Sequence, residues 1–154
     1  MTYMLDTNIC IYAIKKKTES VLLRLRDNME KGLCISSITL AELQYGVCKS
    51  AQPERNAAAL MQFLAILEVM PFDDRAATEY GNLCAYLQKQ GKPTGTMDML
   101  IASHARALSL TMVTNNMLEF ERVPELKLKI GQLNVEEVLC DVFNKIRPSE
   151  DQNF

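Results

Sequence analysis

Short apolar runs alternate with longer amphipathic stretches along this chain, and that alternation constrains its fold more than any other feature. The apolar runs at 2–5, 33–36 and 110–113 are predicted strands, and the short stretches 68–70 and 126–130 are predicted to add two more. The stretches with apolar residues at helical spacing are predicted helices, at 9–16, 20–30, 40–48, 53–67, 74–90 and 97–107. Strands that alternate with helices predict an α/β domain with a mostly parallel sheet.

Residues that favour helix starts support several of these boundaries. Ser37 and Thr39 offer side-chain oxygens that can cap the helix over 40–48. Pro53 suits a first helical position, because its missing N–H has no partner there in any case. Asp73 or Asp74 is expected to cap the long helix that runs to about Gln90.

Length and composition predict a single folded domain. The chain has 154 residues, of which 48% are hydrophobic and 23% charged, the usual mix of a globular protein. Its formal charge is only −2, whereas domains that bind polyanions over a broad surface are usually strongly basic. RNA is not excluded as a substrate, because a local basic rim and a bound cation together can hold a phosphate.

The cysteines and the N-terminus indicate a cytoplasmic protein. Five cysteines occur, an odd number, and no two are separated by two residues, so we expect neither a disulfide framework nor a zinc site. Residues 1–6 lack the charged and apolar regions of a signal peptide. No run of 18 or more apolar residues occurs, so we expect no membrane-spanning segment.

The C-terminal stretch is predicted to be an extension beyond the main domain. Residues 1–131 hold the α/β pattern, and 132–154 follow it. Within the extension we expect a helix over 135–146, since its apolar residues recur at helical spacing. From Pro148 onward the composition is polar, which predicts a disordered end.

Several oxygen-bearing side chains fall where a parallel sheet binds ligands, beyond the carboxyl ends of its strands. Asp6 directly follows the first strand, and Glu42 lies in the helix after the second. Asn116 and Glu119 follow the strand that ends at Val113, while Asp98 begins the helix leading into that strand. We therefore expect these side chains to converge on one edge of the sheet.

Such a cluster would need a cation. Two carboxylates 4 Å apart repel each other by about 4 kcal/mol at an effective dielectric constant near 20. Because the ligands are oxygens, with no convergent His or Cys, the set selects Mg²⁺ or Mn²⁺ over zinc. A divalent ion in this setting predicts phosphodiester hydrolysis by in-line attack of water.

Each residue also has a structural interpretation. Asp6 precedes a helix and suits an N-cap, and Glu42 stands at capping-box spacing from Thr39. Asp98 lies in a first helical turn, where the helix dipole favours any acid. Asn116 tolerates a left-handed turn, and Glu119 suits a solvated loop. The functional interpretation is favoured because independent caps need not all fall at one sheet edge.

Other enzyme classes have little support. His104 is the only histidine, and no G-x-S-x-G motif accompanies it, so we predict a packing or surface role for it. The sequence also lacks a G-x-x-x-x-G-K motif and a dinucleotide-binding fingerprint.

Four segments resemble the motifs of a known family. They are Met4-Leu5-Asp6-Thr7-Asn8, the stretch 35–43, the stretch 97–102, and Val113-Thr114-Asn115-Asn116 followed by Glu119-Phe120. These segments look like PIN-domain motifs, in particular those of the VapC group of type II toxins. Residues 45–50 and 67–73 resemble that group too, so the resemblance covers about 1–126. It departs from the family at Thr96-Met97, where a Gly-Pro pair usually precedes the aspartate.

The resemblance implies a PIN-like three-layer α/β/α domain, about half helical, with a mostly parallel sheet. It implies a Mg²⁺- or Mn²⁺-dependent endoribonuclease that cuts tRNA or ribosomal RNA and so blocks translation. It also implies a homodimer that binds a cognate VapB-type antitoxin in a heterotetramer or a larger assembly.

Residue roles follow from the same resemblance. Asp6 and Asp98 match the family's principal metal ligands, and Glu42 matches a third acid that supports the ion or its water. Family members fill the fourth position either where Asn116 stands or where Glu119 stands. We assign Glu119 as the fourth acid and Asn116 as its hydrogen-bonding neighbour, with Thr114 and Thr7 orienting the ligands.

Two alternatives remain at this point. A phosphatase would use Asp6 as a nucleophile, but such sites want a second Asp two residues later, where this chain has Asn8. A non-catalytic PIN-like module would bind RNA or protein without cutting, although a pure binder gains nothing from clustered carboxylates.

Overall fold

The computed structural model describes residues 3–15, 32–93, 95–114 and 116–129, and it contains one parallel sheet. The strands are β1 (Tyr3–Leu5), β2 (Leu33–Ser36), β3 (Glu68–Met70), β4 (Thr111–Val113) and β5 (Lys127–Lys129). They pair in the order β3-β2-β1-β4-β5, and every pairing is parallel. The predicted strands are confirmed; within the described residues, β4 and β5 each begin one residue later than expected.

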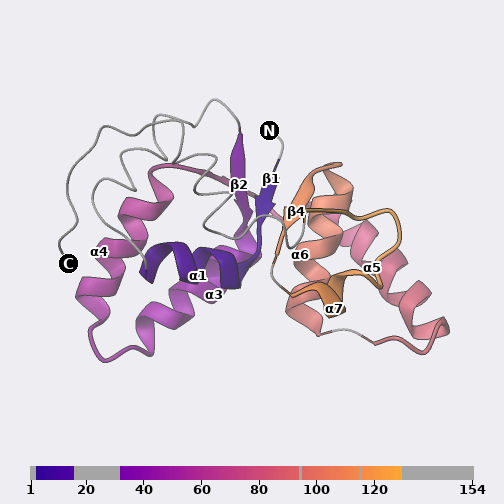
Figure 1. Cartoon of the computed structure of the whole chain (residues 1–154), viewed down its shortest axis with the longest axis horizontal. Coiled ribbons are helices and arrows are strands. Elements are labelled where there is room, and N and C mark those ends of the chain that lie inside the picture. The colour runs from indigo at the N-terminus through magenta and orange to yellow at the C-terminus, as the bar shows by residue number, and fades with distance from the viewer. Residues whose placement is uncertain (1–2, 16–31, 94, 115, 130–154) are drawn as a thin grey trace, which may run out of the picture.

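Helices cover both faces of this sheet (Figure 1). They are α1 (Thr7–Lys15), α3 (Ser37–Cys48), α4 (Pro53–Leu64), α5 (Asp74–Lys89), α6 (Thr96–Ala107) and α7 (Met117–Phe120). In Figure 1, α1, α3 and α4 lie on one side of the strands and α5, α6 and α7 on the other. The predicted three-layer α/β/α architecture is confirmed, with a wholly parallel sheet over the described strands.

The core follows from the alternation of side chains along the strands, since successive residues face opposite sides. One cluster joins Leu5, Ile35 and Val113 to apolar residues of α1, α3 and α4. The other joins Met4, Cys34 and Met112 to residues of α5 and α6. Each trio sits in register on neighbouring strands. A central strand buried on both faces explains why the 2–5 run is continuously apolar.

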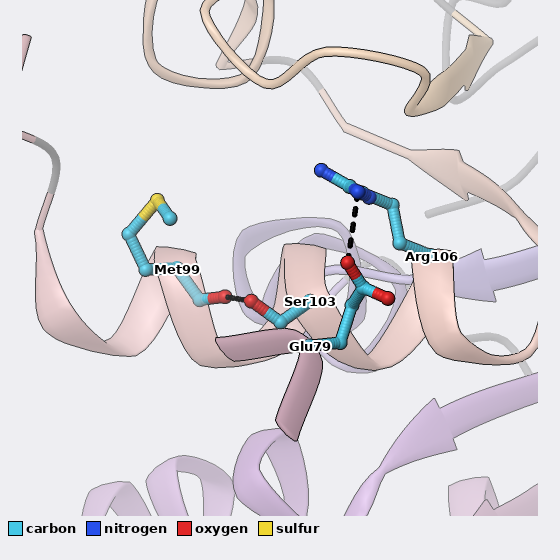
Figure 2. A network of polar contacts seen from close by, with 4 residues as sticks. All are labelled: Glu79, Met99, Ser103 and Arg106. Atoms are coloured by element: carbon cyan, nitrogen blue, oxygen red, sulfur yellow. Dashed lines mark hydrogen bonds and ion pairs between the residues drawn. The ribbon is translucent and has the colours of Figure 1, made fainter. Parts of the chain in front are cut away.

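One ion pair joins α6 to α5, and one buried hydrogen bond lies within α6 (Figure 2). The Arg106 guanidinium lies 2.8 Å from a Glu79 carboxylate oxygen, with both side chains largely buried. Within α6, the Ser103 hydroxyl donates to the Met99 carbonyl at 2.6 Å, which satisfies a buried hydroxyl. These contacts hold the helix whose first turn carries Asp98.

One cap prediction is wrong. Neither Ser37 nor Thr39 caps α3, because Ser36 keeps the extended backbone of β2 and its hydroxyl accepts from the Ile38 N–H at 3.1 Å. Ser37 is already helical, and its hydroxyl accepts from the Phe72 N–H at 3.0 Å. The Thr39 hydroxyl is fully buried and has no hydrogen-bond partner among the described residues. The N-cap is therefore Ser36, one residue before Ser37, the earlier of the two predicted cap residues.

Other boundaries differ in detail. Asp73 rather than Asp74 caps α5, accepting from the Ala76 N–H at 3.0 Å. Helix α4 ends at Leu64, because Ile66 and Leu67 are buried in the turn toward β3. Helix α7 was not predicted. The predicted helix over 20–30 lies outside the described residues. So does the whole predicted extension over 132–154, with its helix over 135–146 and its disordered end. None of the described helices is long and apolar enough to cross a membrane.

Candidate active site

Asp6 lies where the chain leaves the central strand, at the carboxyl edge of the sheet. Its N–H donates to the Val113 carbonyl at 3.1 Å, so it is tied to the end of the neighbouring strand β4. One carboxylate oxygen accepts from the Ile9 N–H at 2.8 Å, and the other accepts from the Thr114 hydroxyl. With 3% of its surface exposed, Asp6 both caps α1 and faces the site.

The surroundings of Asp6 oppose its ionisation on balance. Burial raises the pKa of this carboxyl above its usual value, and the nearby negative charge of Glu42 raises it further. The hydrogen bonds from Thr114 and from the Ile9 N–H lower the pKa, because they favour the charged form. Burial is the largest of these effects, so a metal-free Asp6 is less acidic than an exposed aspartate.

Glu42 projects from α3 toward α1. Its carboxylate accepts a hydrogen bond from the Thr7 hydroxyl, which joins the two helices. The predicted capping box with Thr39 is not formed, because Ser36 is the cap and Glu42 stands well inside the helix. The side chain is half-buried and is held by Thr7 in a fixed position.

Asp98 stands on the third residue of α6, behind an N-cap at Gly95. The helix begins normally without the family's proline, since the Met99 N–H donates to the Gly95 carbonyl at 3.0 Å. Burial raises the pKa of Asp98, and the charges of Asp6, Glu42 and Glu119 raise it further. Three acids, each from a different segment of the chain, are therefore close enough to oppose the ionisation of Asp98.

Asn116 and Glu119 are the two candidates for the fourth position of the acidic site. The Asn116 N–H donates to the Thr114 hydroxyl oxygen at 2.9 Å, and that hydroxyl in turn donates to Asp6. Thr114 thereby links Asn116 to the buried carboxylate. Glu119, in α7, is half-buried and acts on Asp98 through its charge. Neither Asn116 nor Glu119 lines the pocket described next.

A pocket of about 530 Å³ is lined by the other three predicted acids, which come from the end of β1, from α3 and from α6. It is lined by Asp6, Thr7, Asn8, Ile11, Ala41, Glu42, Tyr45, Gly46, Lys49, Met97 and Asp98. The convergence expected from the sheet-edge rule is thus found for Asp6, Glu42 and Asp98.

The sequence reasoning missed one wall of the pocket. Tyr45 and Gly46 of α3 line it together with Lys49, the residue that caps the end of α3, at three, four and seven residues after Glu42. Residues at these spacings share one face of a helix. Helical spacing counted from Glu42 was therefore the signal that would have found them.

The donor set fits a hydrated divalent cation rather than an all-protein cage. Among the described residues, no three His, Cys, Asp or Glu side chains are arranged to hold an ion between them. Mg²⁺ typically keeps several waters and binds through one or two carboxylates, so a pair such as Asp6 and Asp98 is sufficient. Both carboxylates sit at helix N-termini, where backbone N–H groups offset part of their mutual repulsion.

His104 takes no part in the pocket. It is buried, its Nδ1 lies 2.9 Å from the Ser36 hydroxyl oxygen, and its ring meets Phe72 edge-on with centroids 5.4 Å apart. Burial lowers its pKa, while the charge of Asp73 opposes that shift. The predicted packing role is confirmed.

Comparison with known proteins gives matches over most of the chain. A protein-family model described as the PIN domain matches residues 3–126. The chain is 50% identical over 128 residues to a protein of Shigella flexneri named tRNA(fMet)-specific endonuclease VapC, covering 82% of this chain and 96% of the relative. It is 48% identical over 127 residues to Ribonuclease VapC2 of Haemophilus influenzae, with the same shares covered.

Solved structures agree with this similarity. The structure of VapBC2 from Rickettsia felis, bound to a DNA fragment from its promoter, matches with a TM-score of 0.76 and 47% identity, over 85% of this chain and 99% of that one. The DNA-bound VapBC of Salmonella typhimurium matches with a TM-score of 0.75 and 44% identity, over 84% and 98% of the two chains.

Proposed function

The chain belongs to the PIN-domain family and, within it, to the VapC ribonucleases, and from this premise we propose that it hydrolyses RNA at the pocket of Asp6, Glu42 and Asp98. The observation that carries the assignment of the site is that three carboxylates distant in sequence line one pocket at the carboxyl edge of the sheet. Burial raises the pKa of Asp98, and the charges of Asp6 and Glu42 raise it further; together with the shared pocket this is expected of a site completed by a cation.

We assign Asp6 and Asp98 as the ligands of Mg²⁺ or Mn²⁺. When bound, the ion supplies positive charge for the substrate phosphate and polarises the phosphoryl group and the attacking water. Thr114 and the Ile9 N–H hold both oxygens of Asp6 in place, so its orientation does not depend on the ion. Glu119 adds negative charge beside Asp98, which would strengthen the attraction for a cation.

Glu42 supports the attacking water in this proposal. The Thr7 hydroxyl orients its carboxylate, which can then accept the proton that the water loses as its oxygen bonds to phosphorus. The bond from phosphorus to the leaving ribose oxygen breaks in the same displacement. Asn116 acts at one remove, because its N–H fixes the Thr114 hydroxyl that bonds to Asp6.

Transfer RNA is the substrate class that the relatives favour. The Shigella relative is named a tRNA(fMet)-specific endonuclease, and it is half identical to this chain over almost its whole length. Cleavage of tRNA would block translation in the cytoplasm, where we place the protein.

A VapB-type antitoxin is the proposed partner, with the toxin itself a homodimer in a heterotetramer or larger assembly. The related structures from Rickettsia felis and Salmonella typhimurium are VapBC complexes on DNA. Around the pocket, Ile11, Tyr45 and Met97 expose apolar surface that a bound peptide segment would cover.

The proposed domain boundary rests on the same relatives. We propose that residues 1–131 form the PIN domain and that 132–154 form a C-terminal extension. The family match ends at residue 126, and an alignment of 128 residues already covers 96% of the Shigella relative. The extension therefore has no counterpart in that protein.

Metal-dependent cleavage tests the proposed function. Purified protein should cleave bulk tRNA with Mg²⁺ or Mn²⁺, lose that activity in excess EDTA, and regain it when the ion is restored. The Asp98→Asn variant should fold and fail to cleave. Cleavage that persists in chelator would refute the mechanism, and RNA binding without cleavage under every metal condition would favour the non-catalytic module. A covalent phosphate on Asp6 would instead indicate the phosphatase.

A further inference from the structure

Tyr45, Gly46 and Lys49 form a continuous wall of the acidic pocket, which we call the α3 wall. We propose that the α3 wall is a subsite for one unpaired nucleotide of the RNA: Tyr45 stacks on its base and Lys49 binds an adjacent phosphate. This inference rests on the proposed function, and it identifies residues that hold the substrate rather than cleave it.

The exposure of Tyr45 is the first support. This ring is 66% exposed although it lines a pocket, so packing within the described fold does not account for it. Unpaired bases stack on exposed aromatic rings in RNA-binding proteins, whereas bases inside a duplex are already stacked and cannot reach such a ring. The pocket volume of about 530 Å³ is in the range of small-molecule sites, which suits a single nucleotide.

The contact between Lys49 and the Tyr45 ring is the second support. The Lys49 Nζ lies 4.8 Å from the centroid of Tyr45, one helical turn away, in a cation–π contact. The contact restricts a long, flexible side chain to one edge of the pocket. It also brings a positive charge to a pocket whose other charged residues, Asp6, Glu42 and Asp98, are all acidic. A phosphate next to a stacked base would meet that charge.

Gly46 is the third support. A glycine inside a helix is destabilising relative to alanine, yet a Cβ added at Gly46 would meet no atom within 4 Å. Packing among the described residues therefore does not require the glycine. Because Gly46 stands between Tyr45 and Lys49, its missing side chain lets a base or ribose approach the helix backbone closely.

Binding can be measured without cleavage in the full-length Asp98→Asn protein. The probe is a single-stranded oligoribonucleotide of about 12 nucleotides, within the usual span of single-strand sites, with 2-aminopurine at successive positions to report stacking. Tyr45→Ala should weaken binding by roughly 5- to 150-fold, the value of one stacked base, and should abolish the stacking signal. Tyr45→Phe should restore both. Lys49→Gln should reduce the slope of log K against log salt by about 0.7, whereas Lys89→Gln, on exposed α5, should leave it unchanged.

Gly46 has a matched control in Gly81, an exposed glycine of α5 where an added Cβ also meets nothing within 4 Å. Both Gly46→Ala and Gly81→Ala should raise the melting temperature by about 2–4 °C. Gly46→Leu should weaken RNA binding, and Gly81→Leu should not. A glycine substitution that changes RNA binding only at position 46, with matched thermal effects at both positions, would place the loss of binding in the pocket rather than in the stability of the fold.

The outcomes separate the subsite from the nuclease. If otherwise wild-type protein cleaves RNA but Tyr45→Ala leaves the dissociation constant, KM and stacking signal unchanged, the subsite is refuted and the nuclease stands. The same holds if Tyr45→Ala weakens only the binding of a VapB-type protein. If no RNA is cleaved with any divalent ion, yet Tyr45→Ala abolishes stacking, the nuclease is refuted and the subsite stands.

Discussion

Thr39 and Thr114 are buried threonines with opposite surroundings, and replacing each by valine should change stability in opposite directions. Thr114 is 2% exposed, and its hydroxyl both donates to Asp6 and accepts from the Asn116 N–H. Thr39 is 0% exposed, and its hydroxyl has no partner within the described part of the chain. Valine has nearly the same shape as threonine, so the substitution removes a hydroxyl with little change in volume.

The magnitudes follow from the contacts. A hydrogen bond to a charged group contributes about 1.5–3 kcal/mol and an ordinary one about 0.5–1.5 kcal/mol, so Thr114→Val should lower the free energy of unfolding by about 2–4 kcal/mol at neutral pH. An unpaired buried hydroxyl costs about 1–3 kcal/mol. Thr39→Val should raise the free energy of unfolding by about 1 kcal/mol, the lower end of that range, because the surrounding side chains adjust only in part to the new methyl group.

The Thr114 effect should also depend on pH. Its hydroxyl lowers the pKa of Asp6, because it stabilises the charged carboxylate. Removing it raises the folded-state pKa of Asp6 further above the unfolded value, so the loss of stability is largest where Asp6 is ionised. Below the unfolded pKa, both forms of the protein hold the proton, and only a neutral hydrogen bond is lost.

Urea denaturation in EDTA, followed by circular dichroism at pH 7 and near pH 3.5, measures both effects. The exposed Thr78, whose hydroxyl bonds to the Asp74 carbonyl, provides a control, and Thr78→Val should change stability by less than about 0.5 kcal/mol. The reasoning fails if the two buried substitutions change stability in the same direction, or if the cost of Thr114→Val is independent of pH.

Two further predictions concern the acids and the chain end. Asp6 and Asp98 have folded-state pKa values above their unfolded ones, so in EDTA their contribution to stability should be lost as pH rises from about 4 through the raised values. Urea denaturation should show that the free energy of unfolding falls less over this pH range in Asp98→Asn than in the wild-type protein. An equal fall in both proteins would contradict the electrostatic account. Truncation after Gly131 should leave metal-dependent RNA cleavage and divalent-ion binding intact, since the family match ends at 126. A truncated protein that keeps its far-ultraviolet circular dichroism but no longer binds Mn²⁺ would refute that domain boundary.

The fold was largely predictable because its signals are local and repeated. The three central strands β2, β1 and β4 are short and mostly apolar, and parallel pairing places their alternate residues in two buried clusters, so strand positions emerged to within two residues. The cap of α3 was missed because Ser36, Ser37 and Thr39 all have suitable hydroxyls. Which of them caps is decided by the backbone at the end of β2, and composition does not encode that choice.

The site was predictable only in part, for a physical reason of the same kind. Asp6, Glu42 and Asp98 stand beside strand ends, where topology alone brings them together. The orienting role of Thr114 came only from the family resemblance, because its hydroxyl bridges two segments more than a hundred residues apart in sequence, which no local pattern reveals. Tyr45 and Lys49 sit on a helix face whose direction became known only once Glu42 was placed.

Asp6 shows that a cap and a metal ligand need not be competing explanations for one residue. Its carboxylate accepts the Ile9 N–H, which caps α1, and the same side chain lines the pocket. Asparagine caps helices about as well as aspartate, but it has no charge for a cation. Asp6→Asn should therefore keep most of the metal-free stability and lose RNA cleavage. Asp6→Ala should lose cleavage, the cap worth about 1–2 kcal/mol, and the acceptor of the Thr114 hydroxyl. If Asp6→Asn is as unstable in EDTA as Asp6→Ala, the cap contributes little, and the fixed position of Asp6 must depend on its charge rather than on its hydrogen bonds.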